Sequence, residues 1–325
     1  MRAVLVEEYG AIDNIRIDEV RTPELTVGHV LVRVQAASIG FVDGLKVQGL
    51  YQTRDTLPFT PGMEFAGVVE AIAGDVADLS PGMRVMGTAG NGALAEYVAA
   101  RAVDVQPMPD DLPVEAGACC RANYLTALYA LEGRARLQPR ERLLVLGAAG
   151  GTGTAAIQVG KLMGAEVIAA ASTADKMAFA MQAGADAVVD YTDPDWRKAL
   201  ADATGGQGAD VIFDPVGGAV SDQAFRSIAW NGRHVVVGFA SGEIPALKFN
   251  LPLLKGGILT GVDLAQLERR EPELQRALIG QLLEWLDRGD LKPIIGEVFA
   301  FEDFREAFHR MQGRTAAGKM VIRIG

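Results

Sequence analysis

The sequence predicts an α/β protein in which a doubly wound parallel sheet is joined to a smaller, mostly β domain. Three observations predict this fold class. Beyond about residue 122, short apolar runs alternate with helical patterns. One of these runs leads through a glycine-rich turn directly into a helix. The first third of the chain is instead rich in β-branched residues and is broken by Pro-Gly pairs, which is typical of strands joined by turns.

In the second part of the chain, apolar strands that alternate with helices indicate a parallel sheet covered on both faces. Right-handed crossovers then leave the doubly wound fold as the simplest topology. The predicted strands are Leu143–Gly147, Glu166–Ala171, Ala187–Asp190, Asp210–Asp214, His234–Gly238 and Ile258–Val262. The predicted helices between them are Thr152–Met163, Thr173–Ala183, Asp195–Ala203 and Ser221–Ala229. Gly164 and Gly184 stand where a helix C-cap favours positive φ.

The first part of the chain and its last segment are expected to form the other domain. The predicted strands near the N-terminus are Val4–Val6, Val30–Val34 and Gly67–Ile72. After residue 265 we expect helices at Pro272–Arg288 and Phe301–Met311 and a final strand at Lys319–Ile324. Since six strands complete a doubly wound sheet, the final strand is expected to return to the first domain. The domains are therefore predicted as 1–122 with 266–325, and 123–265.

Composition excludes several classes of protein. No stretch approaches the roughly 20 apolar residues of a membrane span, and the first residues reach Glu7 after too short an apolar run for a signal peptide. We therefore expect a cytoplasmic protein without a membrane partner. With 31 basic and 41 acidic residues, the net charge of −10 argues against a nucleic-acid partner. The adjacent Cys119 and Cys120 are unsuited to a disulfide, so we interpret them as small core residues.

The glycine-rich turn predicts a dinucleotide site. A strand runs into Gly147-x-x-Gly150-x-x-Gly153 and then into a helix, a variant of the Rossmann fingerprint Gly-x-Gly-x-x-Gly. Gly150, Gly151 and Thr152 would bring backbone amides close to a pyrophosphate. Gly153 would let the helix pack near the strand. The helix N-terminus adds unpaired N–H groups and a positive dipole end.

The second strand of this unit indicates which dinucleotide binds. NAD-binding proteins usually end that strand with Asp or Glu, which grips the ribose hydroxyls. Here it ends in Ala171-Ser172-Thr173, and no carboxylate is present. Ser172 and Lys176 lie where a 2′-phosphate would hang, and a hydroxyl and an ammonium suit that group. We therefore expect NADPH as the cofactor.

Collinear motifs along the whole chain resemble the medium-chain dehydrogenase/reductase superfamily, in its zinc-free quinone oxidoreductase (zeta-crystallin-like) family. The matching segments are Gly49–Tyr51, Pro61–Val69, Tyr124–Ala127, the glycine-rich turn through Lys161, Ala183–Ala185, Asp214–Gly218, Gly238–Ala240 and Gly318–Val321. The resemblance implies a GroES-like catalytic domain and a Rossmann dinucleotide-binding domain. It also implies an oxidoreductase that is commonly a homodimer, joined through the nucleotide-binding sheets. An apolar strand at Gly257–Val262 would need covering if it lies at a sheet edge.

The positions that match the zinc ligands of related alcohol dehydrogenases are Gly40, Met63 and about Ala122, and none of these can hold a metal. The three histidines, His29, His234 and His309, are scattered, and we interpret them as surface or structural residues. We therefore expect no metal. Without a Lewis acid to stabilise an alkoxide, the substrates favoured are quinones and α,β-unsaturated carbonyls, which delocalise the charge of an incoming hydride themselves.

The resemblance also implies roles for individual residues. Thr126, Tyr191 and Lys319 match cofactor-contacting positions, with Tyr191 beside the 2′-phosphate and Lys319 closing over the cofactor. The loops at Val216, at Gly238, Phe239 and Ala240, and at Val262 are expected to border the cofactor. Tyr51 is the candidate proton donor or orienting group, with the alternative that it only packs at the rim of the cleft. Phe41 and Tyr124 are candidate walls of the substrate pocket, and Asp43 and Glu64 are expected to have structural hydrogen-bonding roles.

Two alternatives to a quinone or enone reductase remain open at this stage. One is an enoyl-thioester or acryloyl-CoA reductase, for which Arg54 and Arg121 could meet the CoA phosphates. The other is an NADPH-binding protein with little turnover that serves a regulatory or structural purpose. In addition, related quinone reductases often carry Asn where this chain has Gly40, a difference that removes a polar contact from the substrate region.

Overall fold

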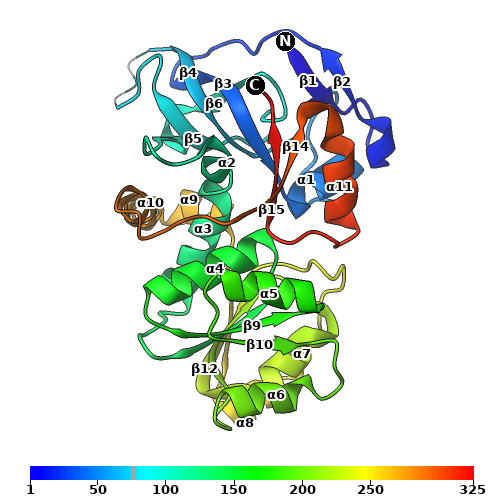
Figure 1. Ribbon diagram of the computed structural model, residues 1–325, viewed down its shortest axis with the longest axis vertical. Helices are drawn as coiled ribbons and strands as arrows, with labels where there is room; N and C mark the ends of the chain where they lie inside the picture. The colour runs from blue at the N-terminus through cyan, green and yellow to red at the C-terminus, as the bar shows by residue number, and fades with distance from the viewer. Residues whose placement is uncertain (75, 77) are drawn as a thin grey trace. The chain divides into compact units, whose positions relative to one another are not determined.

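The computed structural model describes residues 1–74, 76 and 78–325. Asp75 and Ala77, which fall within the predicted first domain, lie outside the described residues. The chain divides into two compact units (Figure 1). The first consists of Met1–Ala122 with Pro293–Gly325, and the second of Asn123–Lys292.

The predicted return to the first domain at residue 266 is wrong, because the segment up to Lys292 packs in the second unit. Its helices are α9 (Leu264–Arg270) and α10 (Pro272–Asp287). α10 contacts α9 and the π-helical segment η3 (Tyr129–Arg134). It buries Leu278, Leu282 and Leu286, so its apolar stripe is covered within the second unit. The sequence pattern shows that such a stripe exists but not which neighbour covers it.

A six-stranded parallel sheet forms the centre of the second unit. Its strands are β8 (Arg142–Leu146), β9 (Glu166–Ala171), β10 (Ala187–Asp190), β11 (Ala209–Asp214), β12 (Ile228–Val236) and β13 (Ile258–Gly261). They lie in the order β10-β9-β8-β11-β12-β13, each pair parallel. The chain thus starts in the middle of the sheet, builds one half and then crosses over to build the other. This order confirms the predicted doubly wound fold.

Helices cover both faces of this sheet (Figure 1). They are α4 (Gly151–Leu162), α5 (Ala174–Gln182), α6 (Trp196–Ala203), α7 (Gly218–Arg226) and α8 (Asn250–Lys255). The core under α6 and α7 brings Trp196 and Phe225 together with apolar side chains of β8, β9 and β11. The central strands β8, β9 and β11 are almost fully buried, which explains why they are apolar throughout rather than alternating. Gly164 and Gly184 adopt positive φ after α4 and α5, as predicted.

The first unit contains a two-stranded and a seven-stranded sheet. The two-stranded sheet is β1 (Arg2–Leu5) with β2 (Arg16–Glu19). The larger sheet runs β14-β15-β3-β4-β5-β7, with β6 paired to β3. Its strands are β3 (His29–Ile39), β4 (Glu64–Ile72), β5 (Arg84–Thr88), β6 (Tyr97–Arg101), β7 (Val105–Pro107), β14 (Ile295–Ala300) and β15 (Lys319–Arg323). The helices are α1 (Phe41–Gln48), α2 (Val114–Gly117), α11 (Phe304–Gln312) and α3 (Arg121–Leu128), which runs on into the second unit.

The C-terminal strand β15 lies in the first unit, as predicted, where it pairs antiparallel with β3 and parallel with β14. This pairing places the start of β15 beside the carboxyl end of β3, since Met320 lies opposite Ile39. Residues far apart in the chain, Lys319 and Gly40, thereby become neighbours. Within the described part of the chain, no helix has both the length and the apolar character that crossing a bilayer requires.

Candidate functional site: a dinucleotide edge and a buried lysine cluster

The carboxyl ends of the six parallel strands form one edge of the sheet in the second unit. All predicted cofactor residues of this unit except Thr126 follow a strand end on this edge. In the order of the strands, the row is Tyr191, then Ser172 with Lys176, the turn Gly147–Thr152, Val216, Gly238–Ala240 and Val262. Five steps of about 4.8 Å between neighbouring strands make the row roughly 24 Å long. An extended dinucleotide can follow such a row.

Backbone hydrogen bonds tie neighbouring loops of this edge together. The bonds are Tyr191 N to Ala171 O at 3.1 Å, Ala148 N to Ala170 O at 3.1 Å, Ala240 N to Pro215 O at 3.0 Å, Ser241 N to Val216 O at 2.8 Å and Val262 N to Val236 O at 3.1 Å. Most of the loops are therefore fixed to the loop or strand beside them. A ligand lying across the edge would meet prearranged backbone rather than independent loops, which lowers the ordering cost of binding.

The glycine-rich turn has the geometry that close approach to a phosphate requires. Gly150 is the N-cap of the 12-residue helix α4, and the first intrahelical backbone bond runs from Thr154 N to Gly150 O at 2.8 Å. The amides of Gly151–Gly153 precede that bond and lie at the positive end of the helix dipole. A Cβ on Gly153 would stand only 2.3 Å from Gly147 O, so this glycine lets α4 pack against the turn. The turn therefore fits a pyrophosphate.

The residues expected around the 2′-phosphate come from two neighbouring strand ends. Ser172 is half-buried directly after β9, and Thr173 caps α5 by accepting a hydrogen bond from Lys176 N at 3.3 Å. This cap holds the half-buried Lys176 in the first turn of α5. The bond from Tyr191 N to Ala171 O brings the loop after β10 to the same place. The nearest carboxylate in sequence, Asp175, is exposed on α5.

A buried polar cluster under the loop after β11 is not evident from the sequence. Asp214, which ends β11 and is 1% exposed, accepts hydrogen bonds from Val216 N at 2.9 Å and Gly217 N at 3.0 Å. It also accepts bonds from the Ser221 hydroxyl and from His234 Nε2, the latter at 2.9 Å. Asp214 thereby fixes the loop that carries Val216. Burial acts to raise the pKa of Asp214, but the bonds from His234 and Ser221 outweigh it and hold that pKa below its usual range.

In the first unit, Lys319 lies in a buried cluster with two carboxylates. Lys319 Nζ donates to Glu64 Oε2 at 2.8 Å, and Glu64 Oε1 accepts from Ala122 N at 2.7 Å. Asp43 accepts from Gly40 N at 2.8 Å and from Gly62 N at 3.2 Å. Asp43 and Glu64 thus have the structural hydrogen-bonding roles expected of them. A Cβ on Gly40 would stand 2.9 Å from Lys319 Nζ, so the missing side chain leaves space for the ammonium.

Charges in this lysine cluster (Asp43, Glu64 and Lys319) depend on one another. Burial acts to lower the pKa of Lys319, but the carboxylates of Glu64 and Asp43 outweigh it, so that pKa is raised and the lysine stays charged. Burial raises the pKa of Asp43, and the charge of Lys319 opposes that rise. The ion pair of Lys319 with Glu64 is not evident from the sequence, which predicts only a cofactor contact for Lys319.

The candidate substrate residues have different environments. Phe41 is 40% exposed in the first turn of α1, and Tyr51 is half-buried in the loop that follows α1. Tyr124 is only 2% exposed, and its hydroxyl donates to Gln158 of α4. Tyr124 therefore packs inside the second unit and is not placed as the predicted wall of a substrate pocket. Thr126 is half-buried in α3.

The described residues contain no group of three or more His, Cys, Asp or Glu side chains placed to hold a metal ion. Cys119 and Cys120 are buried free thiols. Burial raises the pKa of both thiols well above the ordinary value, so they are protonated at neutral pH, in agreement with the core role expected for them.

Comparison with known proteins identifies two family models in the chain. Residues 26–110 match the alcohol dehydrogenase GroES-like domain, and residues 151–279 match a model described as zinc-binding dehydrogenase. Quinone oxidoreductase-like protein 2 of Bos taurus is 38% identical over 94% of this chain and 88% of its own length.

Solved structures agree with this assignment. The quinone oxidoreductase from Thermus thermophilus, also solved in complex with NADPH, is 34% identical, with a TM-score of 0.86 and all of both chains covered. The CurK enoyl reductase is 26% identical, with a TM-score of 0.90 over 100% of this chain and 99% of its own. The first unit thus contains a GroES-like domain and the second a Rossmann domain. The chain belongs to the quinone oxidoreductase family of the medium-chain dehydrogenase/reductase superfamily.

Proposed function

We propose that this oxidoreductase uses NADPH to reduce quinones or other electron-poor α,β-unsaturated carbonyls without a metal ion. The observation that carries the proposal is the row of strand-end loops. The turn Gly147–Gly153 lies in its middle, and Ser172 and Lys176, rather than a carboxylate, lie at the end of β9. The similar quinone oxidoreductase from Thermus thermophilus, which was also solved in complex with NADPH, supports this cofactor.

In this proposal, the chain's own residues mainly bind and orient. The amides of Gly151–Gly153 hold the pyrophosphate, and Ser172, Lys176 and Tyr191 hold the 2′-phosphate. Val216, the loop Gly238–Ala240 and Val262 border the nicotinamide, with Thr126 and Lys319 as further contacts. When bound, the cofactor supplies a hydride. Tyr51 supplies a proton to the acceptor, or hydrogen-bonds its carbonyl oxygen while solvent water supplies the proton, so that hydride and proton together complete a two-electron reduction.

A second candidate function is enoyl-thioester or acryloyl-CoA reduction, which the likeness to an enoyl reductase favours. Of the two arginines considered for the CoA phosphates, Arg121 is buried and engaged, which leaves only the exposed Arg54. Arg121 is 4% exposed and donates to Gln106 Oε1 at 2.8 Å, and the Arg54 guanidinium lies over the ring of Tyr9 at 5.6 Å. These contacts weigh against CoA and in favour of a small acceptor. A protein with little turnover remains the alternative outside catalysis.

One steady-state assay separates these functions. NADPH oxidation is followed with 1,4-benzoquinone, 9,10-phenanthrenequinone, 1-octen-3-one and crotonyl-CoA as acceptors, before and after treatment with a zinc chelator. The proposal expects turnover with a quinone or the enone, little with crotonyl-CoA, and no effect of the chelator. Turnover only with crotonyl-CoA would favour the second function. Tight NADPH binding without oxidation by any acceptor would favour a non-catalytic role.

We expect Lys176→Glu to weaken NADPH selectively. The substitution places a carboxylate beside the 2′-phosphate and removes a charge-assisted bond worth about 1.5–3 kcal/mol, so KM for NADPH should rise roughly 10- to 100-fold. KM for NADH should change little, because NADH lacks that phosphate. Lys248→Glu, the same charge change at an exposed loop residue, should leave both values unchanged. Equal effects of Lys176→Glu on the two cofactors would remove the 2′-phosphate assignment.

We expect Tyr51→Phe to lower kcat with 1-octen-3-one by roughly 100-fold, the usual contribution of a general acid. KM for NADPH should stay unchanged, because Tyr51 is not assigned to the cofactor. Tyr97→Phe removes a hydroxyl from the half-buried strand β6 and serves as the matched control. Unchanged turnover in Tyr51→Phe would assign this tyrosine to packing alone.

We further propose a homodimer joined through β13. This strand lies at the edge of the sheet, with Ile258 54% and Leu259 50% exposed. An exposed apolar edge strand invites pairing with another strand. We expect the wild type to sediment as two chains and Ile258→Lys to sediment as one, since a lysine on the edge opposes strand pairing. A wild type that sediments as a single chain at micromolar concentration would contradict the dimer.

A further inference from the structure

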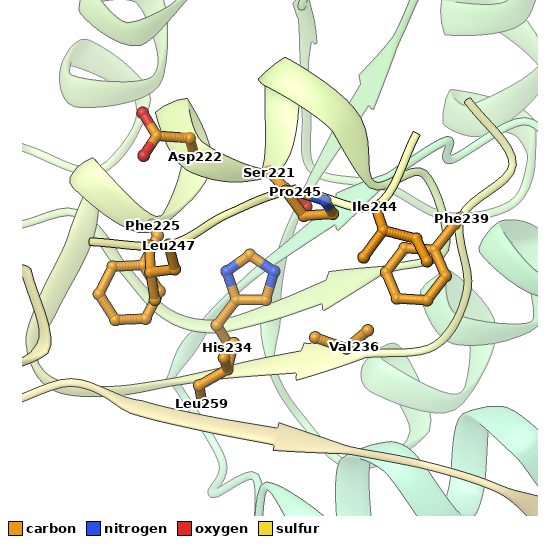
Figure 2. A pocket seen from close by; sticks show the side chains of 10 residues that line it. All are labelled: Ser221, Asp222, Phe225, His234, Val236, Phe239, Ile244, Pro245, Leu247 and Leu259. Carbon is orange, nitrogen blue, oxygen red and sulfur yellow. The ribbon is translucent and has the colours of Figure 1, made fainter. Parts of the chain in front are cut away.

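A cavity of about 160 Å³ lies beside β12 within the second unit, on the side of the sheet that α7 covers. Figure 2 shows the side chains that line it. The lining is mostly apolar and includes Phe225 of α7, Phe239 and Leu247 of the loop after β12, and Leu259 of β13. For scale, an apolar cavity of about 150 Å³ is large enough to hold benzene. The size therefore suits a small ring rather than a dinucleotide.

One polar group in this lining lacks a partner. His234 is 2% exposed, and its Nδ1 is buried with no hydrogen-bond partner among residues 1–74, 76 and 78–325. In Figure 2 the imidazole stands between Phe225 and Leu247 on one side and Phe239 and Ile244 on the other. A buried polar atom that makes no hydrogen bond costs about 1–3 kcal/mol. Such an atom beside a cavity is explained by a bound small molecule, water included, that supplies the missing bond.

The hydrogen bonds of the imidazole ring determine whether Nδ1 accepts or donates a hydrogen bond. Asp214 already accepts bonds from two backbone amides and from the Ser221 hydroxyl, and its carboxylate is the partner of His234 Nε2 at 2.9 Å. An ionised carboxylate only accepts hydrogen bonds, so Nε2 carries a proton, and in that tautomer of the uncharged imidazole Nδ1 carries none. Nδ1 is then an acceptor. The missing partner must donate an O–H or N–H.

The surroundings of Nδ1 favour an aromatic donor. Phe225 stacks on the His234 ring with centroids 5.8 Å apart and planes at 25°, and Phe239 contributes a second aromatic side chain to the cavity. Aromatic rings gain about 0.5–1.5 kcal/mol from offset or edge-to-face contacts beyond simple burial. Most of the lining is apolar, so a second polar group on the ligand would be buried without a hydrogen bond. A ligand with a single hydroxyl avoids that cost.

We propose that this cavity is a second small-molecule site, which binds a phenol with its ring against Phe225 and Leu247 and its hydroxyl donating to His234 Nδ1. Because the atom itself is covered, the ligand displaces a side chain as it enters. Leu247 lies in the irregular segment 237–249 and is only half-buried, so it can move aside. The loop that carries Leu247 is held to the start of α7, just after Val216 of the cofactor edge, because Gly218 N donates to Glu243 O at 3.0 Å.

The test is calorimetric titration of the full-length protein with phenol, toluene and anisole. These probes share a ring, but only phenol donates a hydrogen bond. One net hydrogen bond is worth about 0.5–1.5 kcal/mol, so phenol should bind roughly 2- to 12-fold more tightly than toluene or anisole. Toluene or anisole binding as tightly as phenol would overturn the assignment of His234 as acceptor. Absence of phenol binding at about 10 mM would overturn the site itself and assign Nδ1 to water.

Two variants separate the hydrogen bond from the cavity. His234→Gln keeps an amide donor for Asp214 but has no acceptor at the Nδ1 position, so the preference for phenol over toluene should disappear while toluene still binds. Leu247→Trp fills the cavity and should abolish binding of both. Leu253→Trp, at a 79% exposed position on α8, is the matched control and should bind like the wild type. Phenol binding that survives Leu247→Trp would contradict the location.

A final titration distinguishes this cavity from the cofactor edge. It is needed because Phe239 lines the cavity and is also one of the proposed cofactor contacts. Phenol is titrated in the presence of saturating NADPH. Retained phenol binding supports a separate site. Loss of phenol binding would place the probe in the cofactor site and overturn the proposal. If NADPH itself does not bind, the proposed function fails, but the phenol titrations of the free protein still decide on the cavity.

Discussion

Replacing Gly153 with alanine should abolish measurable NADPH binding although it adds only one methyl group. The new Cβ would lie 2.3 Å from Gly147 O and 2.8 Å from Ala148 Cα. Both are backbone atoms, so no side chain can rotate away, and the start of α4 must move off the turn. Each amide bond to a charged phosphate is worth about 1.5–3 kcal/mol, so losing two should weaken binding by 100-fold or more. Overpacking should also cost about 1–3 kcal/mol of stability.

Two other glycines provide matched controls for this change. Gly280 lies inside α10, where an added Cβ meets nothing within 4 Å. Gly280→Ala should therefore stabilise the protein by about 0.5–1 kcal/mol and leave NADPH binding unchanged. Gly150 has φ −77°, which alanine accepts, and an added Cβ would stand 3.3 Å from Gly147 O, so Gly150→Ala should cost less stability than Gly153→Ala while still weakening NADPH binding. Calorimetry and urea unfolding measure both quantities. A Gly153→Ala variant that binds NADPH like the wild type would contradict the proposed phosphate site.

Lys319→Met should strongly destabilise the first unit. Lys319 and Glu64 side chains are 11% and 2% exposed, and their contact is 2.8 Å. Removing one partner of such a buried pair typically costs about 3–5 kcal/mol, because the other charge remains without compensation. Lys161→Met is the control, since Lys161 and Asp186 are 37% and 39% exposed and surface pairs contribute at most about 1 kcal/mol.

The loss in Lys319→Met should depend on pH. In the wild type the pKa of Lys319 is raised, so its contribution is full below the ordinary lysine pKa and is lost only as the pH rises through the higher folded value. Without Lys319, the pKa of Asp43, already raised by burial, should rise further. A carboxyl whose folded pKa exceeds its unfolded pKa loses stability as pH rises. The deficit should thus be smaller at about pH 5 than at about pH 8, and an equal deficit would contradict this electrostatic account.

Much of the Rossmann unit could be predicted because local patterns determine it. β9 and β10 have the predicted bounds, and the strand before the glycine-rich turn is displaced by one residue. The apolar runs of these strands are short and are separated by helices, so the doubly wound strand order was the simplest one to predict. β12 begins at Ile228, six residues before the predicted start and inside the end of a predicted helix. β-branched and aromatic residues there fit either element, and pairing with β11 decides in favour of the strand.

Contacts between distant residues could not be predicted. The sequence shows Lys319 and Glu64 as two charged residues more than 250 positions apart, and only the pairing of β15 with β3 and of β3 with β4 brings them together. The burial of Tyr124 could not be predicted, because the sequence does not distinguish a buried aromatic residue from one that lines a pocket. The contact among Asp214, Ser221 and His234 could not be predicted either, because it depends on how the crossover through α7 places β11, α7 and β12. A buried Asp at a strand end, with Ser and His following in the next helix and strand, is the only signal the sequence offered.

The central claim is that the strand-end edge of the second unit grips a dinucleotide and prefers the 2′-phosphorylated form. Its most direct test is calorimetric titration of the wild-type protein with NADPH and, separately, with NADH. The contacts of Ser172 and Lys176 predict one bound NADPH per chain and a Kd roughly 10- to 100-fold lower than that of NADH. Equal affinity for the two would contradict the preference, and no heat of binding with either would contradict the site.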